Sequence, residues 1–274
     1  MKRASKLFNF IIIAAFIVTS CSKETDTEIP DDGIYAIRST FSYGKTNTKF
    51  IYNSFGKIAE YQSFYFCYRY IYDNNGRLIK DEVAPAIDLY SSGSADRNEL
   101  MTSQNSTFTG YSLYEYGLEG ILKSKKYYNK NDGVYEFTLK ISFEYENGNI
   151  VKWNMLNAGD TITQYYAYEY DNNRNVINEK QYSYIFTEGP GPELIRETTY
   201  QYDDKNNPYI IYKETGQPGL FSNTNNVIET NSTLFIDVPG IDKYTTSKTN
   251  YEYNAKGFPV KVISGTSVYE YIYK

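Results

Sequence analysis

Paired carboxylates are the residues in this sequence whose type and spacing come closest to a known chemistry. Such pairs are common, and Asp31/Asp32, Glu144/Glu146 and Asp203/Asp204 are examples. A glycoside hydrolase needs two carboxyl groups that face each other across a cleft. Glu144 and Glu146 share one face of an alternating segment, as acids do on any solvated strand face. We therefore assign no catalytic residue and keep a carboxylate-dependent glycan hydrolase as an alternative.

The 274-residue chain contains no histidine. This rules out a Ser-His-Asp triad, a Cys-His pair and a histidine-ligated metal site. Cys67 lies in an apolar stretch without an imidazole to activate it, so we predict a packing residue. Asp73 and Asp171 precede turn residues, and we expect them to accept hydrogen bonds from turn amides rather than to bind calcium. The sequence thus predicts no metal site and no cofactor.

The N-terminus predicts a lipid anchor. Lys2, Arg3 and Lys6 precede an apolar run over residues 7–18, which is too short to span a bilayer and has the size of a signal-peptide core. Val18-Thr19-Ser20-Cys21 is similar to a bacterial lipobox, which implies that Cys21 becomes the lipidated first residue of the mature protein. We expect a signal peptide over 1–20, a lipidated flexible tether over 21–33 and a single domain over 34–274.

The tether and the charge of the chain indicate where the protein resides and what it avoids. Lys23 followed by acidic residues resembles the surface-export signal of Bacteroidota lipoproteins, so we expect an outer-membrane protein on the cell surface rather than the periplasmic face. The formal net charge of -5 gives no electrostatic reason to bind nucleic acid. The expected partners are the membrane, through the anchor, and a glycan or protein ligand.

The rest of the chain is organised by a repeated tyrosine-rich hairpin. Tyrosine occurs 32 times and aromatic residues make up 18% of the chain, a composition that favours strands. One copy runs from Tyr166 through an Asp171-Asn172-Asn173 turn to Ile177. The second tyrosine of each copy falls at positions 52, 72, 116, 145, 170, 202, 253 and 271. Residues 134–146 alternate strictly between apolar and polar, and Asn147-Gly148 is a hairpin signal.

These patterns predict an all-β fold without a helix. We expect one antiparallel up-and-down meander of about fourteen strands, in a strongly curved or barrel-like sheet. Residues 61–72 read as one long strand, and the aromatic face should lie on the concave side. The pattern fails over 81–110 and 215–240, so we expect function to lie there rather than in the repeats.

The repeats resemble a known type. Residues 70–78 and 168–173 are similar to the tyrosine-aspartate (YD, or Rhs-type) repeats of bacterial surface proteins, whose hairpins wrap into large sheets. With the lipobox, the chain also resembles an uncharacterised group of Bacteroidota lipoproteins with a domain of unknown function and a porin-like fold. Pro208 and Pro259 depart from the repeat. The group has no established activity, so the resemblance implies no functional residues for this chain.

The sequence best fits a non-enzymatic cell-envelope lipoprotein that acts as a binding or structural module. Its ligand-binding residues are unknown, although Trp153 or aromatic residues near 81–110 are suited to stacking on sugars. A pore-forming barrel is a weaker alternative, because the predicted anchor and the polar strand faces argue against it.

Overall fold

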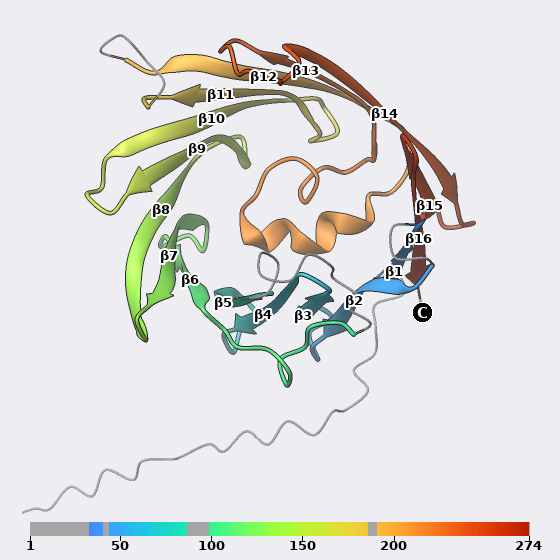
Figure 1. Cartoon of the computed structure of the whole chain (residues 1–274), viewed down its shortest axis with the longest axis horizontal. Coiled ribbons are helices and arrows are strands. Elements are labelled where there is room, and N and C mark those ends of the chain that lie inside the picture. Colours follow the sequence, from blue (N-terminus) through green and yellow to red (C-terminus); the bar gives the residue numbers. More distant parts are fainter. Residues whose placement is uncertain (1–32, 41–43, 87–98, 186–190, 274) are drawn as a thin grey trace, which may run out of the picture.

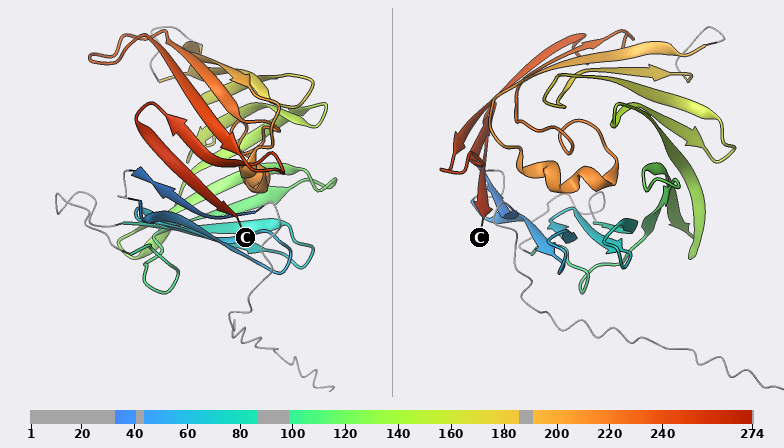
Figure 2. Two further views of the ribbon diagram at one scale, coloured as in Figure 1. Left: turned by 90° about the vertical axis from the view of Figure 1, so that its right-hand side faces the viewer. Right: turned by 180° about the vertical axis from the view of Figure 1, so that it is seen from behind.

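The computed structural model describes residues 33–40, 44–86, 99–185 and 191–273. Sixteen antiparallel strands close into a barrel, in which each strand pairs with its neighbours in sequence (Figures 1 and 2). The first strand, β1 (Ile34–Ser39), pairs with the last, β16 (Ser267–Tyr273), and completes the circle. The predicted antiparallel meander is confirmed. The sheet, which was predicted to be strongly curved or barrel-like, closes completely into a barrel.

The other strands follow in chain order. They are β2 Thr46–Tyr52, β3 Ile58–Ser63, β4 Phe66–Tyr72, β5 Leu78–Pro85, β6 Gly110–Tyr116, β7 Leu122–Asn131, β8 Val134–Glu146, β9 Asn149–Asn157, β10 Ile162–Tyr170, β11 Val176–Ser183, β12 Glu193–Tyr202, β13 Val227–Leu234, β14 Tyr244–Tyr253 and β15 Pro259–Ser264. One 3₁₀ helix, η3 (Pro208–Thr215), lies between β12 and β13. No helix among the described residues is long and apolar enough to cross a membrane.

The prediction of one long strand over residues 61–72 is wrong. The chain turns after Ser63 and returns as β4, with Tyr61 opposite Tyr68. The Ser63 hydroxyl accepts hydrogen bonds from the amides of Tyr65 (3.3 Å) and Phe66 (2.9 Å). A serine hydroxyl thus satisfies this turn, and the Gly, Pro or Asn signal that normally marks one is not needed.

Hairpin turns of one kind recur at one end of the barrel. In the turn after β4, the Asp73 side chain accepts hydrogen bonds from the amides of Asn75 and Arg77, each at 2.9 Å. Gly76 takes the fourth position with a φ of 72°. Asn53, Asp171 and Asn254 make the same side-chain bonds in the turns after β2, β10 and β14. The predicted role of Asp73 and Asp171 as acceptors for turn amides is confirmed. We call this end of the barrel the turn end.

At the turn end, a tyrosine hydroxyl joins each of the eight strand pairs that run from an odd-numbered strand to the next even-numbered strand. Every even-numbered strand carries a tyrosine that donates a hydrogen bond to the first or second backbone carbonyl of the odd-numbered strand before it. The donor and acceptor pairs are Tyr52–Ile34, Tyr72–Ile58, Tyr116–Leu78, Tyr145–Leu122, Tyr170–Ile150, Tyr202–Val176, Tyr251–Val227 and Tyr273–Pro259. Strand pairs that have no turn at this end are thus linked through a side chain. We call this set the tyrosine ring.

Six of the eight repeat tyrosines picked out from the sequence belong to the ring, and two do not. In the last two copies the ring uses Tyr251 and Tyr273 instead of Tyr253 and Tyr271. The hydroxyl of Tyr253 bonds to the Asp203 carboxylate, and the hydroxyls of Tyr271 and Tyr209 lie 2.8 Å apart. Both tyrosines therefore contact the β12–β13 connection, which spacing along the sequence does not reveal.

The barrel has an apolar inner face and a polar outer face. On β8, Ile141 and Phe143 are buried inside, whereas Glu144 points outward to Lys152 on β9 at 3.5 Å. Similar cross-strand pairs join Lys126 to Glu115 (2.6 Å) and Lys261 to Glu252 (2.8 Å). Strand alternation in β8 is as predicted, with the aromatic face mainly on the concave side.

The segment predicted to break the pattern over 81–110 is partly regular. β5 continues to Pro85, and residues 87–98 lie outside the described residues. Met101 and Phe108 pack with Cys67, Ala84 and Ala86. Cys67 is fully buried and its burial raises the pKa of the thiol to about 12, so its predicted role as a packing residue is confirmed.

The tyrosine ring yields a stability prediction. Tyr170→Phe removes the hydroxyl that donates to the Ile150 carbonyl at 2.6 Å. A part-buried hydrogen bond of this kind contributes about 0.5–1.5 kcal/mol, so urea unfolding should show a loss of that size. Tyr244→Phe, at a side chain that is 71% exposed, is the matched control and should leave the midpoint unchanged. Equal midpoints for the two variants would show that the ring does not stabilise the barrel.

Candidate functional site

The connection between β12 and β13 folds back into the lumen of the barrel (Figure 1). We call residues 203–226 the plug. Its centre is η3, where the Asn207 side chain accepts from the Tyr209 amide at 3.0 Å and Pro208 begins the helix. The prediction of no helix is wrong here, because eight residues are too few to show a helical period and capping specifies the helix instead. The strand pattern, expected to fail over 215–240, is interrupted up to residue 226 and resumes in β13; the location of function in this segment stays a prediction.

Buried asparagines hold the plug to the wall. Asn223 is 1% exposed, and its side-chain oxygen accepts from the Val176 amide at 2.9 Å. Asn175 donates to the Asn225 side chain at 3.0 Å and accepts from the Asn225 amide at 2.9 Å. Asn207 donates to the carbonyls of Leu220 and Asn223. Each amide side chain supplies donors and acceptors at once, which allows polar backbone to be buried in the lumen.

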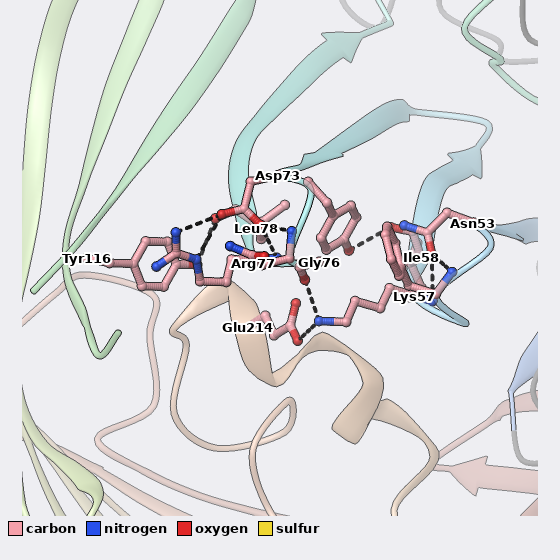
Figure 3. Close-up of polar contacts among 12 residues, drawn as sticks. Asn53, Lys57, Ile58, Asp73, Gly76, Arg77, Leu78, Tyr116 and Glu214 are labelled. Atoms are coloured by element: carbon pink, nitrogen blue, oxygen red, sulfur yellow. Dashed lines mark hydrogen bonds and ion pairs between the residues drawn. The ribbon is translucent and has the colours of Figure 1, made fainter. Parts of the chain in front are cut away.

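A lysine joins the plug to two turns at the turn end. Lys57 Nζ lies 2.5 Å from the Glu214 carboxylate on η3 and 2.5 Å from the Gly76 carbonyl (Figure 3). The side chains of Lys57 and Glu214 are about 30% exposed, at 31% and 29%, so the ion pair contributes little to stability. It fixes the orientation of η3 instead.

A chamber of about 710 Å³ lies between the plug and the inner wall of β2 to β7. Its wall is mostly aromatic, with Phe50, Tyr61, Phe66, Tyr68, Tyr70 and Tyr127 from the strands and Tyr209, Tyr212 and Phe221 from the plug. Phe66 at its edge is 39% exposed, so the chamber reaches solvent at the end opposite the turn end. Its volume is in the range of ligand pockets.

One ion pair lies in this aromatic wall. Lys125 Nζ is 2.8 Å from the Asp81 carboxylate, and the Tyr114 hydroxyl donates to the same carboxylate at 2.5 Å. Burial acts to lower the pKa of Lys125, but Asp81 and Tyr127 outweigh it and raise the pKa above its ordinary value. The rings of Tyr114 and Tyr127 each lie 4.8 Å from the ammonium. The Lys125 ammonium is therefore paired and held in place by Asp81 and the two rings.

Five tyrosines of the chamber have a raised pKa and are therefore neutral hydrogen-bond donors. Burial raises the pKa of Tyr68, Tyr70 and Tyr127, and it raises that of Tyr209 to about 12. Tyr212 is 7% exposed and its pKa is also raised by burial. Its hydroxyl has no hydrogen-bond partner among the described residues. A buried, unpaired hydroxyl costs free energy, so the wall holds one donor whose bonding capacity the fold does not use.

The structure separates the carboxylate pairs found in the sequence. Glu144 faces outward with its side chain 57% exposed, and Glu146 lies at the exposed end of β8. Asp203 accepts from the Asn226 amide and side chain within the plug connection, while Asp204 is exposed beside Lys205. Asp31, Asp32 and the predicted lipid-anchor residue Cys21 lie outside the described residues.

Other predicted features fall on the inner wall or find no counterpart. Trp153 packs inside, edge-on to Tyr166 at 5.0 Å between ring centroids, so it is not an exposed stacking platform. Within the described ranges, no group of three or more histidine, cysteine, aspartate or glutamate side chains is placed to hold a metal ion.

Sequence reasoning missed Asp81, Lys125 and Tyr212. Asp81 and Lys125 are far apart in the sequence, and each looks like an ordinary surface charge. The position of Asp81 within its strand was the available signal. Asp81 and Val83 lie on the same strand face, and they pair with the inward-facing Tyr70 and Tyr68 of β4. A charge at an inward position is rare unless it is paired. Tyr212 had no such signal, since its surroundings depend on how the plug folds.

No protein-family model and no curated protein matches the sequence. Similar solved structures include a porin-like protein from Bacteroides uniformis, at 11% identity over 88% of this chain and 98% of that chain, with a TM-score of 0.41. A porin-like protein from Bacteroides vulgatus has 13% identity over 88% and 99%, with a TM-score of 0.38. A protein of unknown function from Bacteroides fragilis has 14% identity over 48% and 89%, with a TM-score of 0.34.

Two of these structures are described as porin-like, as is the group that the sequence resembles. The resemblance to YD repeats stays a prediction.

The fit of the plug against the wall can be tested at Gly216, the residue that ends η3. A Cβ there would lie 2.5 Å from Leu122 Cδ2 and 3.0 Å from Phe143 Cζ, at a φ of 72°. Gly240 has a φ of 80° with nothing within 4 Å, so Gly240→Ala matches the backbone strain without the clash. Gly216→Ala should lower the free energy of unfolding by about 1–3 kcal/mol more than Gly240→Ala, measured by urea unfolding. Equal losses would show that the plug is loosely seated.

Proposed function

We propose that this protein is a non-enzymatic binding protein of the bacterial cell envelope, whose ligand enters the aromatic chamber. The observation that carries the proposal is the chamber itself, with its neutral tyrosines, one fixed ion pair and the unpaired Tyr212 hydroxyl. Ligand pockets characteristically combine an apolar lining with a few convergent polar groups.

The chemistry of the wall favours a glycan as the ligand. Tyrosine offers an apolar ring face together with a polar hydroxyl, and it loses little conformational freedom on binding. A sugar ring has the matching combination of apolar faces and hydroxyl edges. Lys125 and Asp81 add a donor and an acceptor near the same wall, and the Tyr212 hydroxyl adds a donor. A protein ligand would need an extended surface, which a chamber of about 710 Å³ inside the barrel does not offer.

The alternative of a glycan hydrolase has less support. Hydrolysis requires two carboxyl groups across the bond that breaks, and Asp81 is the one carboxylate among the described residues that line the chamber. Asp81 is also bonded to Lys125 and Tyr114. The chamber therefore supports binding better than turnover.

The alternative of a pore also has less support. A membrane-spanning barrel presents an apolar band about 25 Å tall to lipid and a polar lumen. Here the charged ladder of Lys126, Glu115, Lys152 and Glu144 is on the outside, while the aromatic residues face the lumen. The plug also occupies that lumen. This polarity suits a barrel that stands in water and is attached to a membrane by other means.

A lipid on Cys21 would supply that attachment. The described chain begins at residue 33, and Ile34 lies at the turn end, where its carbonyl accepts from Tyr52. The chamber reaches solvent at the opposite end. A tether that enters at the turn end leaves the mouth of the chamber directed away from the anchored side. This arrangement suits an outer-membrane lipoprotein on the cell surface.

Tyr212→Phe tests the chamber. The variant removes a hydroxyl that is unpaired in the free protein, so the urea midpoint should stay the same or rise. If that hydroxyl binds the ligand, affinity should fall about two- to tenfold for a glycan selected on an array and measured by calorimetry. Tyr244→Phe on β14 is the control and should change neither quantity.

The same glycan distinguishes binding from hydrolysis. A reducing-sugar assay on the intact protein should show no turnover under conditions where calorimetry shows binding. Turnover that disappears in Asp81→Asn or Glu144→Gln would instead support the hydrolase. Array binding that is unchanged in Tyr212→Phe would remove the chamber from the proposal.

Cys21→Ser tests the anchor. Cells fed an alkyne-labelled fatty acid should label the native chain and not the variant, because the lipidated thiol is gone. Cys67→Ser is the matched control and should keep the label, since Cys67 is buried in the barrel. Protease added to intact cells should cut the native domain if it is surface-exposed. Label retained in Cys21→Ser would contradict the anchor, and a fully protected domain would contradict surface exposure.

A further inference from the structure

A second cavity of about 490 Å³ lies at the turn end. The plug separates it from the aromatic chamber. On η3, Tyr209 and Tyr212 line the chamber, whereas Lys213 and Glu214 line this cavity. Tyr116, Tyr145 and Tyr170 of the tyrosine ring form part of its wall. Their hydroxyls are already bonded to backbone carbonyls, so the charged groups determine what the cavity attracts.

The cavity has an excess of positive charge. Arg77, Arg174 and Lys213 line it together with one acid, Glu214. Glu214 is paired with Lys57, and Arg77 is paired with Asp73 at 2.8 Å (Figure 3). Arg174 and Lys213 have no carboxylate partner among the residues that the structure describes. Two uncompensated cations thus share one cavity in a chain whose formal net charge is -5.

The backbone at Arg174 makes this arrangement unusual. Arg174 takes the fourth position of the turn after β10, with a φ of 67°. The equivalent turns at this end use Gly56, Gly76, Gly120 and Gly257 at that position. The other described non-glycine residues with positive φ are Asp132, Asn147 and Asp160, and Asn and Asp tolerate this region far better than arginine does. The turn therefore keeps an arginine at a strained position, and the side chain of that arginine lines the cavity.

We propose that this cavity binds a phosphate group through Arg174 and Lys213. Guanidinium groups match the geometry of phosphate oxygens, and phosphate monoesters carry about two negative charges at neutral pH, which balances the two free cations. Asn149 also lines the cavity and offers a side-chain amide donor, whereas the hydroxyls of Ser222 and Thr224 already donate to the carbonyls of Gly219 and Asn173. The phosphate belongs either to a lipid headgroup, since the tether enters at this end, or to a soluble molecule.

Arg174→Gly separates a binding role from a structural one. The variant installs the residue that the equivalent turns use, so without phosphate its thermal midpoint should equal or exceed that of the native chain. Inorganic phosphate should raise the native midpoint more than sodium chloride at equal ionic strength. In Arg174→Gly the affinity for phosphate should fall about tenfold or more. Lys213→Gln should also weaken binding, and Lys152→Gln on the outer face should not.

Two outcomes would overturn the proposal. One is a phosphate effect no larger than that of chloride on the native chain, and the other is an undiminished phosphate effect in both Arg174→Gly and Lys213→Gln. Vesicles that contain phosphatidic acid then distinguish the sources. Co-sedimentation of the native chain that is lost in Arg174→Gly assigns the site to a lipid headgroup, and binding of inorganic phosphate without co-sedimentation assigns it to a soluble phosphate. The cavity and the aromatic chamber are separate, so failure here leaves the proposed glycan binding untouched.

Discussion

The architecture depends on how a barrel of sixteen strands is held together at one end. At the turn end, alternate pairs of neighbouring strands are joined by hairpin turns, and the pairs between them have no covalent connection there. The tyrosine ring joins those pairs, because each hydroxyl donates to a backbone carbonyl of the neighbouring strand. A β-bulge often interrupts the regular strand pairing at these positions. In the β4–β5 pair, for example, the register shifts between Ile71 and Tyr72, and Tyr72 then bonds back to Ile58 at 2.8 Å. Eight of the 32 tyrosines thus have a structural role at this end of the barrel.

A barrel of this size leaves a lumen too wide for its wall residues to fill. Barrels of eight strands are filled by their own side chains, whereas barrels of about sixteen strands leave a channel or hold additional chain. Here the β12–β13 connection supplies the plug, and buried asparagines satisfy its backbone. The plug divides the lumen into two cavities of different character, an aromatic chamber and a cationic cavity. Both candidate binding regions therefore result from one inserted segment.

The sequence revealed features that repeat and missed those that depend on a single contact between distant residues. Alternation over residues 134–146 located β8, and Asp73 and Asp171 were recognised as turn residues because their role is local. The turn at Ser63 was missed because a hydroxyl replaces the usual Gly or Asn. Asp81 and Lys125 meet across three strands, and Tyr212 reaches the wall through the plug. No local pattern encodes such contacts, so the candidate site was less predictable than the fold.

The pairing of β1 with β16 has a consequence for how the protein must form. All other strand pairs join neighbours in sequence, so hairpins can assemble progressively along the chain. The contact between Ile34 and Tyr273 instead requires both ends of the domain. Until the last strand arrives, β1 and the most recent hairpin each expose an unpaired edge, which is a template for aggregation. Loss of the final few residues would therefore prevent closure of the barrel and leave its edge strands unpaired.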